Sequence, residues 1–148
     1  MVAYHYRECG LDNVVIEGFS LVEDHAGEET LTIPAIGMLH SVIAEGIVSL
    51  PVKMTGPELR FLRTEMGLTQ EQLAEILRVK PLTVSRWERS DPIPDPSEML
   101  VRLLAVDRLE LDVELDVDGV SAKVTRAPRS NPIRIDASNP DKYSLLVA

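Results

Sequence analysis

The chain has little of what disulfide-bonded, exported or membrane-spanning proteins contain. Cys9 is its only cysteine, so an internal disulfide is excluded and a reducing, cytoplasmic setting is expected. No run of about 18 apolar residues occurs, so no helix is expected to cross a membrane. The N-terminal stretch MVAYHYRECG lacks the basic and apolar regions of a signal peptide. These absences favour a cytoplasmic protein.

Sequence motifs of catalysis are missing as well. The three histidines have no spacing that suits a nucleophile, a base or a metal site. Neither a phosphate-binding loop nor the motifs GxSxG and HExxH occur. Asp112, Glu114 and Asp116 form an acidic group, but they alternate with apolar residues, which is typical of the solvated outer face of a strand. We therefore expect no enzyme and no cofactor.

Charge is unevenly distributed along the 148 residues, of which 45% are apolar, enough for one domain or two small ones. The net charge of −9 argues against nucleic-acid binding at first sight. Residues 1–54 hold two basic and eight acidic side chains, and residues 91–148 hold seven and eleven. Residues 55–90 hold six basic and five acidic side chains. Only this middle segment has a charge that suits DNA, whereas the acidic ends suit a basic partner protein or repel non-specific DNA.

The stretch TQEQLAEILRVKPLTVSRWER (69–89) predicts two short helices joined by a tight turn. Thr69 begins a capping box of the form T-x-x-Q at the start of the first helix. Pro81 suits the first position of the second helix, where its missing N–H is not needed. Val84 and Trp87 are three residues apart and are expected to face the core. The other face of the second helix is polar and basic, which suits insertion into a DNA major groove.

This stretch resembles the Cro/repressor-type helix-turn-helix family, also labelled XRE. The matching residues are GLTQEQLA (67–74), Val79 and TVSRWER (83–89), and GPELRFLR (56–63) is similar to the first helix of the family. The resemblance implies a transcriptional regulator that binds operator DNA as a homodimer. In such dimers the two recognition helices lie about 34–36 Å apart, one turn of DNA.

Two residues depart from the family at its turns. Arg78 stands where the family usually has glycine, and a positive φ at a non-glycine residue has a steric cost. Ser90 replaces the usual glycine after the recognition helix. Both departures lie at the turns, so the face that would read DNA keeps the family pattern.

The resemblance also implies which residues contact DNA. Gln70 would contact a phosphate from the N-terminus of its helix. Arg86 would read a guanine, and Leu82 would contact a thymine methyl group. Lys80 would contact a phosphate or a guanine, and Arg89 would hold a phosphate. The full set of expected DNA-binding residues is Gln70, Lys80, Pro81, Leu82, Thr83, Ser85, Arg86 and Arg89.

Each of these roles has a structural alternative. Gln70 is otherwise a solvated polar residue at a helix start, and Arg86 otherwise pairs with Glu88 or a neighbouring acid on the surface. Leu82 is otherwise part of the core. Trp87 occupies an apolar position of the motif, so we expect it in the core and not stacked on a base.

Residues 1–52 predict a small β-rich domain that ends in a helix. Residues 4–9 suit a short strand or an ordered entry to the domain. Residues 14–23 and 30–36 are rich in β-branched and apolar residues and are separated by a polar turn, so they predict a hairpin. Apolar spacing over residues 38–50 predicts a helix, which the following proline ends.

Cys9 and the glycine after it resemble the remnant of the zinc-binding domain of the MqsA-type (YgiT-like) antitoxins. Those proteins use two CxxC pairs, so a four-cysteine zinc site is impossible with one cysteine. His5, Cys9, His25 and His40 are an alternative set of ligands, but no characteristic spacing supports them. We favour a zinc-free domain in which Cys9 is a small buried hydrophobe, and we predict no metal site.

Residues 53–109 predict the helix-turn-helix domain. Thr55 begins a second capping box at the start of its first helix. Residues 91–96 contain three prolines and predict a loop, after which Ser97 is expected to cap a helix over 98–109. The residues of that helix expected to face the core are Leu100, Leu103 and Leu104, with Val101 as a further candidate.

Residues 110–148 predict a β-hairpin and a tail. Apolar and polar residues alternate over 111–125, and Asp118 with its following glycine suits a two-residue hairpin turn. The apolar face of such a hairpin would pack on the N-terminal domain or on a second copy, because an isolated hairpin is marginally stable. A short strand at 133–135 and a strand or tail at 143–148 complete the segment.

The sequence thus predicts an α+β fold with a small N-terminal β-rich domain, a central bundle of four or five helices that contains the helix-turn-helix, and a C-terminal β-hairpin. The predicted function is that of a sequence-specific DNA-binding regulator that acts as a homodimeric repressor of its own operon. An antitoxin that neutralises a basic toxin protein is the specific subclass expected. The alternative is a protein-interaction module in which the helix-turn-helix is only a scaffold.

Overall fold

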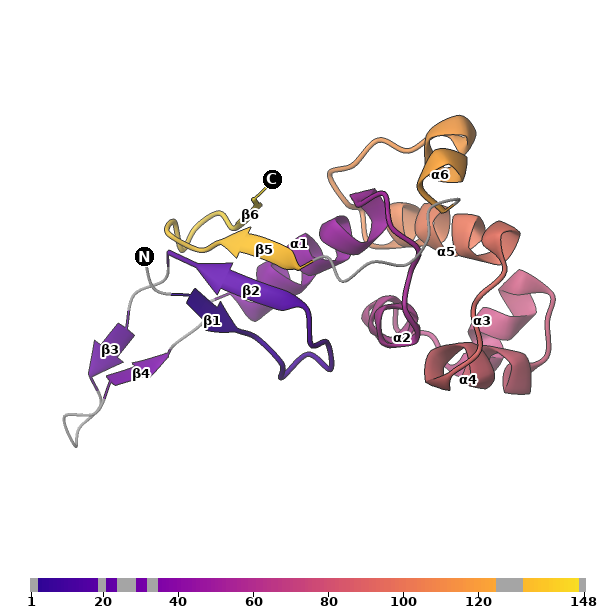
Figure 1. The fold of residues 1–148 in the computed structure, drawn as a ribbon, viewed down its shortest axis with the longest axis horizontal. Helices are drawn as coiled ribbons and strands as arrows, with labels where there is room; N and C mark the ends of the chain where they lie inside the picture. The colour runs from indigo at the N-terminus through magenta and orange to yellow at the C-terminus, as the bar shows by residue number, and fades with distance from the viewer. Residues whose placement is uncertain (1–2, 19–20, 24–28, 32–34, 125–131, 147–148) are drawn as a thin grey trace.

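The computed structural model describes residues 3–18, 21–23, 29–31, 35–124 and 132–146. The described chain is mixed α and β, as the sequence predicts, and is elongated in the view of Figure 1. A two-stranded sheet lies at one end and the helices α3 (Gln70–Leu77) and α4 (Pro81–Arg89) lie at the other. A four-stranded sheet and its covering helix lie between them.

The four-stranded sheet is built from both ends of the chain. Its order is β1 (Ala3–His5), β2 (Val14–Glu17), β5 (Ile133–Asp136) and β6 (Ser144–Leu145). The central pair β2–β5 is parallel, and the outer pairs are antiparallel. Buried and half-buried residues alternate in β2 and β5, so one face of the sheet is apolar. The four buried residues of the central strands are Val14, Ile16, Ile133 and Ile135.

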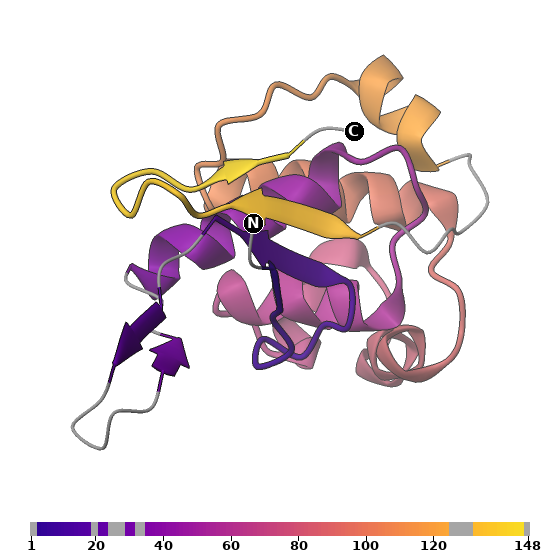
Figure 2. The same cartoon turned by 60° about the vertical axis from the view of Figure 1, so that its left-hand side comes forward.

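Helix α1 (Ile36–Ser49) covers this apolar face, as Figure 2 shows. The predicted helix over 38–50 is therefore confirmed. Gly46 lies in the middle of α1, and a Cβ atom there would be 2.8 Å from Ile133 Cγ2. Glycine at this position lets the helix approach the sheet closely, which offsets its low helix propensity.

The predicted hairpin of strands 14–23 and 30–36 is correct only for the residues next to its turn. Strands β3 (Leu21–Glu23) and β4 (Glu29–Leu31) pair antiparallel and form a separate two-stranded sheet. The first part of the predicted strand, β2, instead joins the four-stranded sheet, because Val14 and Ile16 bury their side chains there. The turn residues 24–28 lie outside the described chain.

The helix-turn-helix segment follows the sequence prediction closely. Helix α2 (Gly56–Glu65) begins with the capping box of Thr55, and α3 begins with that of Thr69. In both, the threonine side chain and the third helical residue exchange hydrogen bonds with each other's backbone N–H. Each box thus satisfies two of the four N–H groups that a helix start leaves unpaired, so the start of each helix is well defined.

Helix α5 (Asp95–Arg108) differs from the prediction at its start and on its inner face. It begins at Asp95, with Pro96 in its first turn, where the ring is tolerated, so Ser97 is not its cap. Its fully buried apolar residues are Val101 and Ala105, whereas Leu100 is 43% exposed. The inner face is rotated relative to the predicted one because α5 also buries a charged pair.

That charged pair consists of Glu98 and Arg102, whose side chains are both 0% exposed. Their ion pair spans 3.1 Å, and Glu98 also accepts a hydrogen bond of 2.9 Å from the Met54 N–H. Burial raises the pKa of Glu98, and the charge of Arg102 opposes this shift. Arg102 donates to three carbonyl groups at the end of α1 and in the linker to α2, those of Val48, Leu50 and Val52. The pair therefore joins α5 to the segment that connects the sheet with the helix-turn-helix.

The predicted hairpin over 111–125 is wrong. Residues 111–116 form neither helix nor strand, and Val117–Val124 form helix α6, which packs on α5. Asp116 explains the helix start, because its Oδ1 accepts a hydrogen bond of 2.6 Å from the Gly119 N–H. Val120 is fully buried. The predicted turn residues 118–119 thus lie in the first turn of a helix.

No helix among the described residues is both long enough and apolar enough to span a lipid bilayer.

Candidate nucleic-acid interface

The candidate interface is the outer face of α4, presented by the turn that follows α3. Arg78 closes α3 in the left-handed region, with φ 60° and ψ 41°, and its backbone N–H donates to the carbonyls of Ala74 and Glu75. Lys80 is extended and precedes the first helical residue, Pro81. Arg78 thus has a positive φ although it is not glycine, so the turn closes α3 in the left-handed conformation that glycine usually supplies.

Helix α4 has a buried and an exposed face. Val84 and Trp87 are buried, as predicted, and pack in the core with Leu73 and Leu77 of α3. Leu82 is 54% exposed, so it is not a core residue of this chain. Of the residues predicted to bind DNA, five are exposed and three are half-buried. The exposed ones are Lys80, Pro81, Leu82, Arg86 and Arg89, and the half-buried ones are Gln70, Thr83 and Ser85.

The guanidinium groups on this face differ in how they are held. Arg89 Nε donates to the Ser85 carbonyl at 3.2 Å, within α4 itself. In the described chain the Arg86 side chain makes no hydrogen bond and no ion pair, and it does not pair with Glu88. An exposed guanidinium without a protein partner has all its donors available to a base edge or a phosphate.

Glu88 instead joins three helices beneath this face. Its carboxylate accepts from Arg63 of α2 at 2.7 and 3.1 Å, and from the Gln70 side-chain amide of α3 at 3.2 Å. The side chain of Glu88 is 4% exposed and that of Arg63 is 12% exposed. The sequence analysis missed this network, because nothing in the local pattern of either helix shows which charges meet across the fold.

A close backbone approach also positions α4. A Cβ atom at Gly56 would lie 2.5 Å from the carbonyl oxygen of Glu88. Only glycine therefore allows the start of α2 to lie against the end of α4 at this distance. Helix α4 is held at its end by backbone packing and by the Arg63–Glu88 ion pair.

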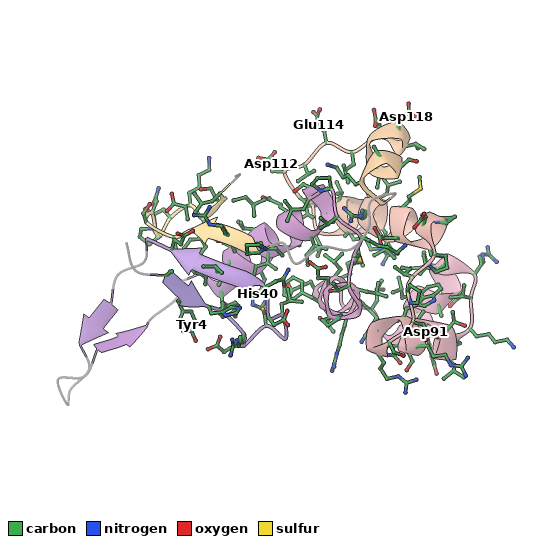
Figure 3. The ribbon with its side chains drawn as sticks, in the orientation of Figure 1. Tyr4, His40, Asp91, Asp112, Glu114 and Asp118 are labelled. Atoms are coloured by element: carbon green, nitrogen blue, oxygen red, sulfur yellow. The ribbon has the colours of Figure 1, made fainter. Side chains whose placement is uncertain are left out.

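His40, one of the four residues of the alternative zinc ligand set, makes other interactions. The Tyr6 hydroxyl lies 3.0 Å from His40 Nε2, and His40 Nδ1 lies 2.8 Å from Glu65 Oε1. His40 lies between the sheet and α2 in Figure 3. Burial raises the pKa of the Cys9 thiol, which disfavours the thiolate that metals bind. Within the described ranges no group of three or more ligating side chains could hold a metal ion, and His25 lies outside them.

The acidic residues of segment 111–116 point outward, although that segment is not a strand. Asp112, Glu114 and Asp116 are exposed, and the residues between them are half-buried. Figure 3 shows Asp112, Glu114 and Asp118 along the edge of the molecule opposite to α4. The carboxylates are thus exposed to solvent, as the alternation in the sequence predicts.

The comparisons with known proteins agree with the helical part of this description. Residues 59–112 match the family model described as Helix-turn-helix, and this range runs from within α2 to just beyond α5. The match covers neither residues 1–58 nor residues 113–148, so it says nothing about the sheets, α1 or α6. No curated protein and no solved structure matches the chain.

Proposed function

We propose that this chain, which carries a helix-turn-helix domain in residues 59–112, is a sequence-specific DNA-binding transcriptional regulator. The observation that carries the proposal is the exposed face of α4, where Lys80, Arg86 and Arg89 surround the exposed Leu82. A short helix with a buried apolar face and a basic outer face suits the DNA major groove.

The roles of the side chains follow from their positions. Arg86 has free donors for guanine O6 and N7, and Leu82 at the start of α4 suits a thymine methyl group. Gln70 gives one amide N–H to Glu88 and keeps the second for a phosphate oxygen. The exposed N-terminus of α3 favours the same phosphate through its backbone N–H groups. Phosphate contacts hold the register, whereas Arg86 and Leu82 read the sequence.

Acidic residues limit non-specific binding. Glu71 and Glu75 are exposed on α3, and Asp91 is exposed just after α4. With a net charge of −9 the whole molecule is repelled by the DNA backbone. The affinity for DNA must then depend on a few cations of α4 and on base contacts. The binding constant should therefore fall less steeply with salt concentration than is usual for a DNA-binding protein.

A homodimer is part of the proposal. Helix α4 has nine residues, so its exposed face reaches only a few base pairs. Two copies on a palindromic operator, with recognition helices about 34–36 Å apart, would supply the missing specificity. Repression of its own operon in the cytoplasm fits such a small regulator.

The antitoxin subclass rests on charge alone. Residues 1–54 hold eight acidic and two basic side chains, which suits the neutralisation of a basic toxin protein. A second function, a protein-interaction module whose helix-turn-helix is only a scaffold, is favoured by the same overall charge and by the left-handed Arg78 in the turn.

Fluorescence anisotropy with DNA from upstream of the gene separates these functions. The wild type, Arg86→Ala and the control Arg108→Ala, an exposed arginine of α5, are titrated at two salt concentrations. We expect Arg86→Ala to lose about 1–3 kcal/mol and to lose preference at one base position, with Arg108→Ala close to wild type. Weak binding that is indifferent to sequence and equal in all three proteins would support the scaffold function instead.

A further inference from the structure

We propose that segment 112–116 and the groove beside it bind an extended, basic segment of a partner protein. The groove has a volume of about 660 Å³. It lies between segment 112–116, α5 and α6, on the side of the molecule opposite to α4 in Figures 1 and 2. Its lining residues from these three elements include Val106, Val113, Leu115 and Gly119.

The first observation is an unused stretch of backbone. Leu111 N–H donates to the Val106 carbonyl, and Asp112 N–H lies 3.4 Å from Glu45 Oε1. For the three residues that follow, 113–115, the described part of the chain supplies no backbone hydrogen bond in either direction. Such a stretch has the property of a sheet edge, whose free N–H and C=O groups can pair with an added strand.

The second observation is the alternation of side chains along this stretch. Val113 and Leu115 are half-buried against the core, and Glu114 between them is exposed. Asp112 and Asp116 flank them on the exposed side. A strand added here would therefore meet apolar side chains on its inner side and a row of carboxylates on its outer side.

The charges of the groove select the partner. Lys123 lines the groove, but its Nζ donates to the Ser49 carbonyl at 2.6 Å and is thereby drawn toward the end of α1. The Asp116 carboxylate accepts a hydrogen bond from the Gly119 N–H. Glu114 is exposed, and its carboxylate accepts no hydrogen bond within the described chain. A segment in which lysine or arginine alternates with valine or leucine complements this surface in charge and in periodicity.

The location makes this function independent of DNA binding. Helix α6 and segment 112–116 lie at the upper side of the molecule in both views, and α4 lies at the lower side. A partner on the groove would leave the face of α4 open. Failure of the DNA titration described above would leave the present proposal standing, and the reverse holds as well.

The test uses a fluorescein-labelled peptide of sequence KVKVKVK and the full-length protein. We expect the basic peptide to bind, the matched peptide EVEVEVE not to bind, and KVKVKVK with N-methyl groups on alternate residues to bind at least about tenfold more weakly because one hydrogen-bonding edge is blocked. In ¹⁵N NMR, the peptide should shift and protect the amides of Val113 and Leu115.

Charge reversal locates the site. Glu114→Lys should weaken KVKVKVK binding about tenfold, whereas Asp91→Lys, the same charge change in the loop after α4, should change it by less than about twofold. Glu114 is exposed, so the variant should fold, and its thermal melting is compared with that of the wild type. Equal weakening by both variants, or shifts outside residues 106–123, would show general attraction to an acidic protein and overturn the proposal. It would also be overturned if Glu114→Lys dissolved a dimer in sedimentation velocity, because the groove would then bind a second copy.

Discussion

Arg63 Nε of α2 lies 2.7 Å from Glu88 Oε2 of α4, and this ion pair is nearly inaccessible to solvent. Arg63 also donates to the Leu68 carbonyl at 2.9 Å, at the end of the turn between α2 and α3. Glu88 also accepts a hydrogen bond from the side-chain amide of Gln70. The two residues therefore connect α2 with α4, and they hold Gln70, one of the residues predicted to contact DNA, in place.

Removal of one partner of this pair should be strongly destabilising. We expect Glu88→Ala to lower the free energy of unfolding by about 3 kcal/mol, because Arg63 is left largely buried without its counter-charge. Urea denaturation measures the effect, with Glu71→Ala, an exposed acid of α3, as a control that stays within about 0.5 kcal/mol of wild type. A double-mutant cycle with Arg63→Met should show coupling, and strictly additive losses would contradict the described pair.

Two glycines of α1 should respond oppositely to alanine. A Cβ atom added at Gly37 has no heavy atom within 4 Å. Gly37→Ala should therefore stabilise the protein by up to about 1 kcal/mol, because alanine has the higher helix propensity. Gly46→Ala places its Cβ 2.8 Å from Ile133 Cγ2, so it should destabilise by about 1–3 kcal/mol. Thermal or urea unfolding of both variants checks the packing of α1 on the sheet. A stabilising Gly46→Ala would mean that α1 and β5 are not in contact at this point.

Glu45 should make stability dependent on pH. Burial raises the pKa of its carboxyl above the ordinary value of 4.5, so the folded state binds its proton more tightly than the unfolded state does. This contribution is fully present below the unfolded pKa and is lost as the pH rises through the folded pKa. Glu45→Gln should therefore be more stable than wild type near neutral pH, and the difference should shrink toward about pH 4.

Urea unfolding of both proteins at several pH values measures this difference. The control is Glu75→Gln, which replaces an exposed glutamate of α3. It should show no comparable gain in stability over wild type near neutral pH. A difference in stability between Glu45→Gln and wild type that grows as the pH falls would have the wrong sign for a carboxyl with a raised pKa and would contradict the prediction.

The start of α6 can be tested at two neighbouring aspartates. Asp116→Ala should cost about 0.5–2 kcal/mol, because the Gly119 N–H loses its 2.6 Å acceptor at the helix start. Asp118→Ala should have a smaller effect, since Asp118 is exposed in the first turn, where the helix dipole is its main interaction within the described chain. The melting temperatures of the two variants show which substitution destabilises the protein more. If Asp118→Ala were the more damaging, a hairpin turn at 118–119 would be the better description.

Much of the helix-turn-helix was predictable from the sequence because its signals are local. Both capping boxes, Pro81 at the start of α4 and the apolar spacing of Val84 and Trp87 act within one or two helical turns. The sequence showed that Arg78 replaces the usual glycine of the turn, but only the structure shows that its φ is positive. The assignment of Gln70, Lys80, Pro81, Leu82, Thr83, Ser85, Arg86 and Arg89 to DNA contacts stays a prediction, since their placement shows exposure and not binding.

Tertiary structure decided what depends on distant partners. The pairing of β2 with β5 joins Val14 to Ile133, and Arg63 meets Glu88 only once α2 and α4 have packed. Segment 111–124 shows the limit most clearly. Its alternation and Asp118-Gly119 fit a hairpin locally, yet Asp116 can also cap a helix. The helix forms where α5 offers a surface on which Val120 becomes fully buried. Burial of apolar area outweighs a weak local preference for a turn, and only the folded neighbours determine which area can be buried.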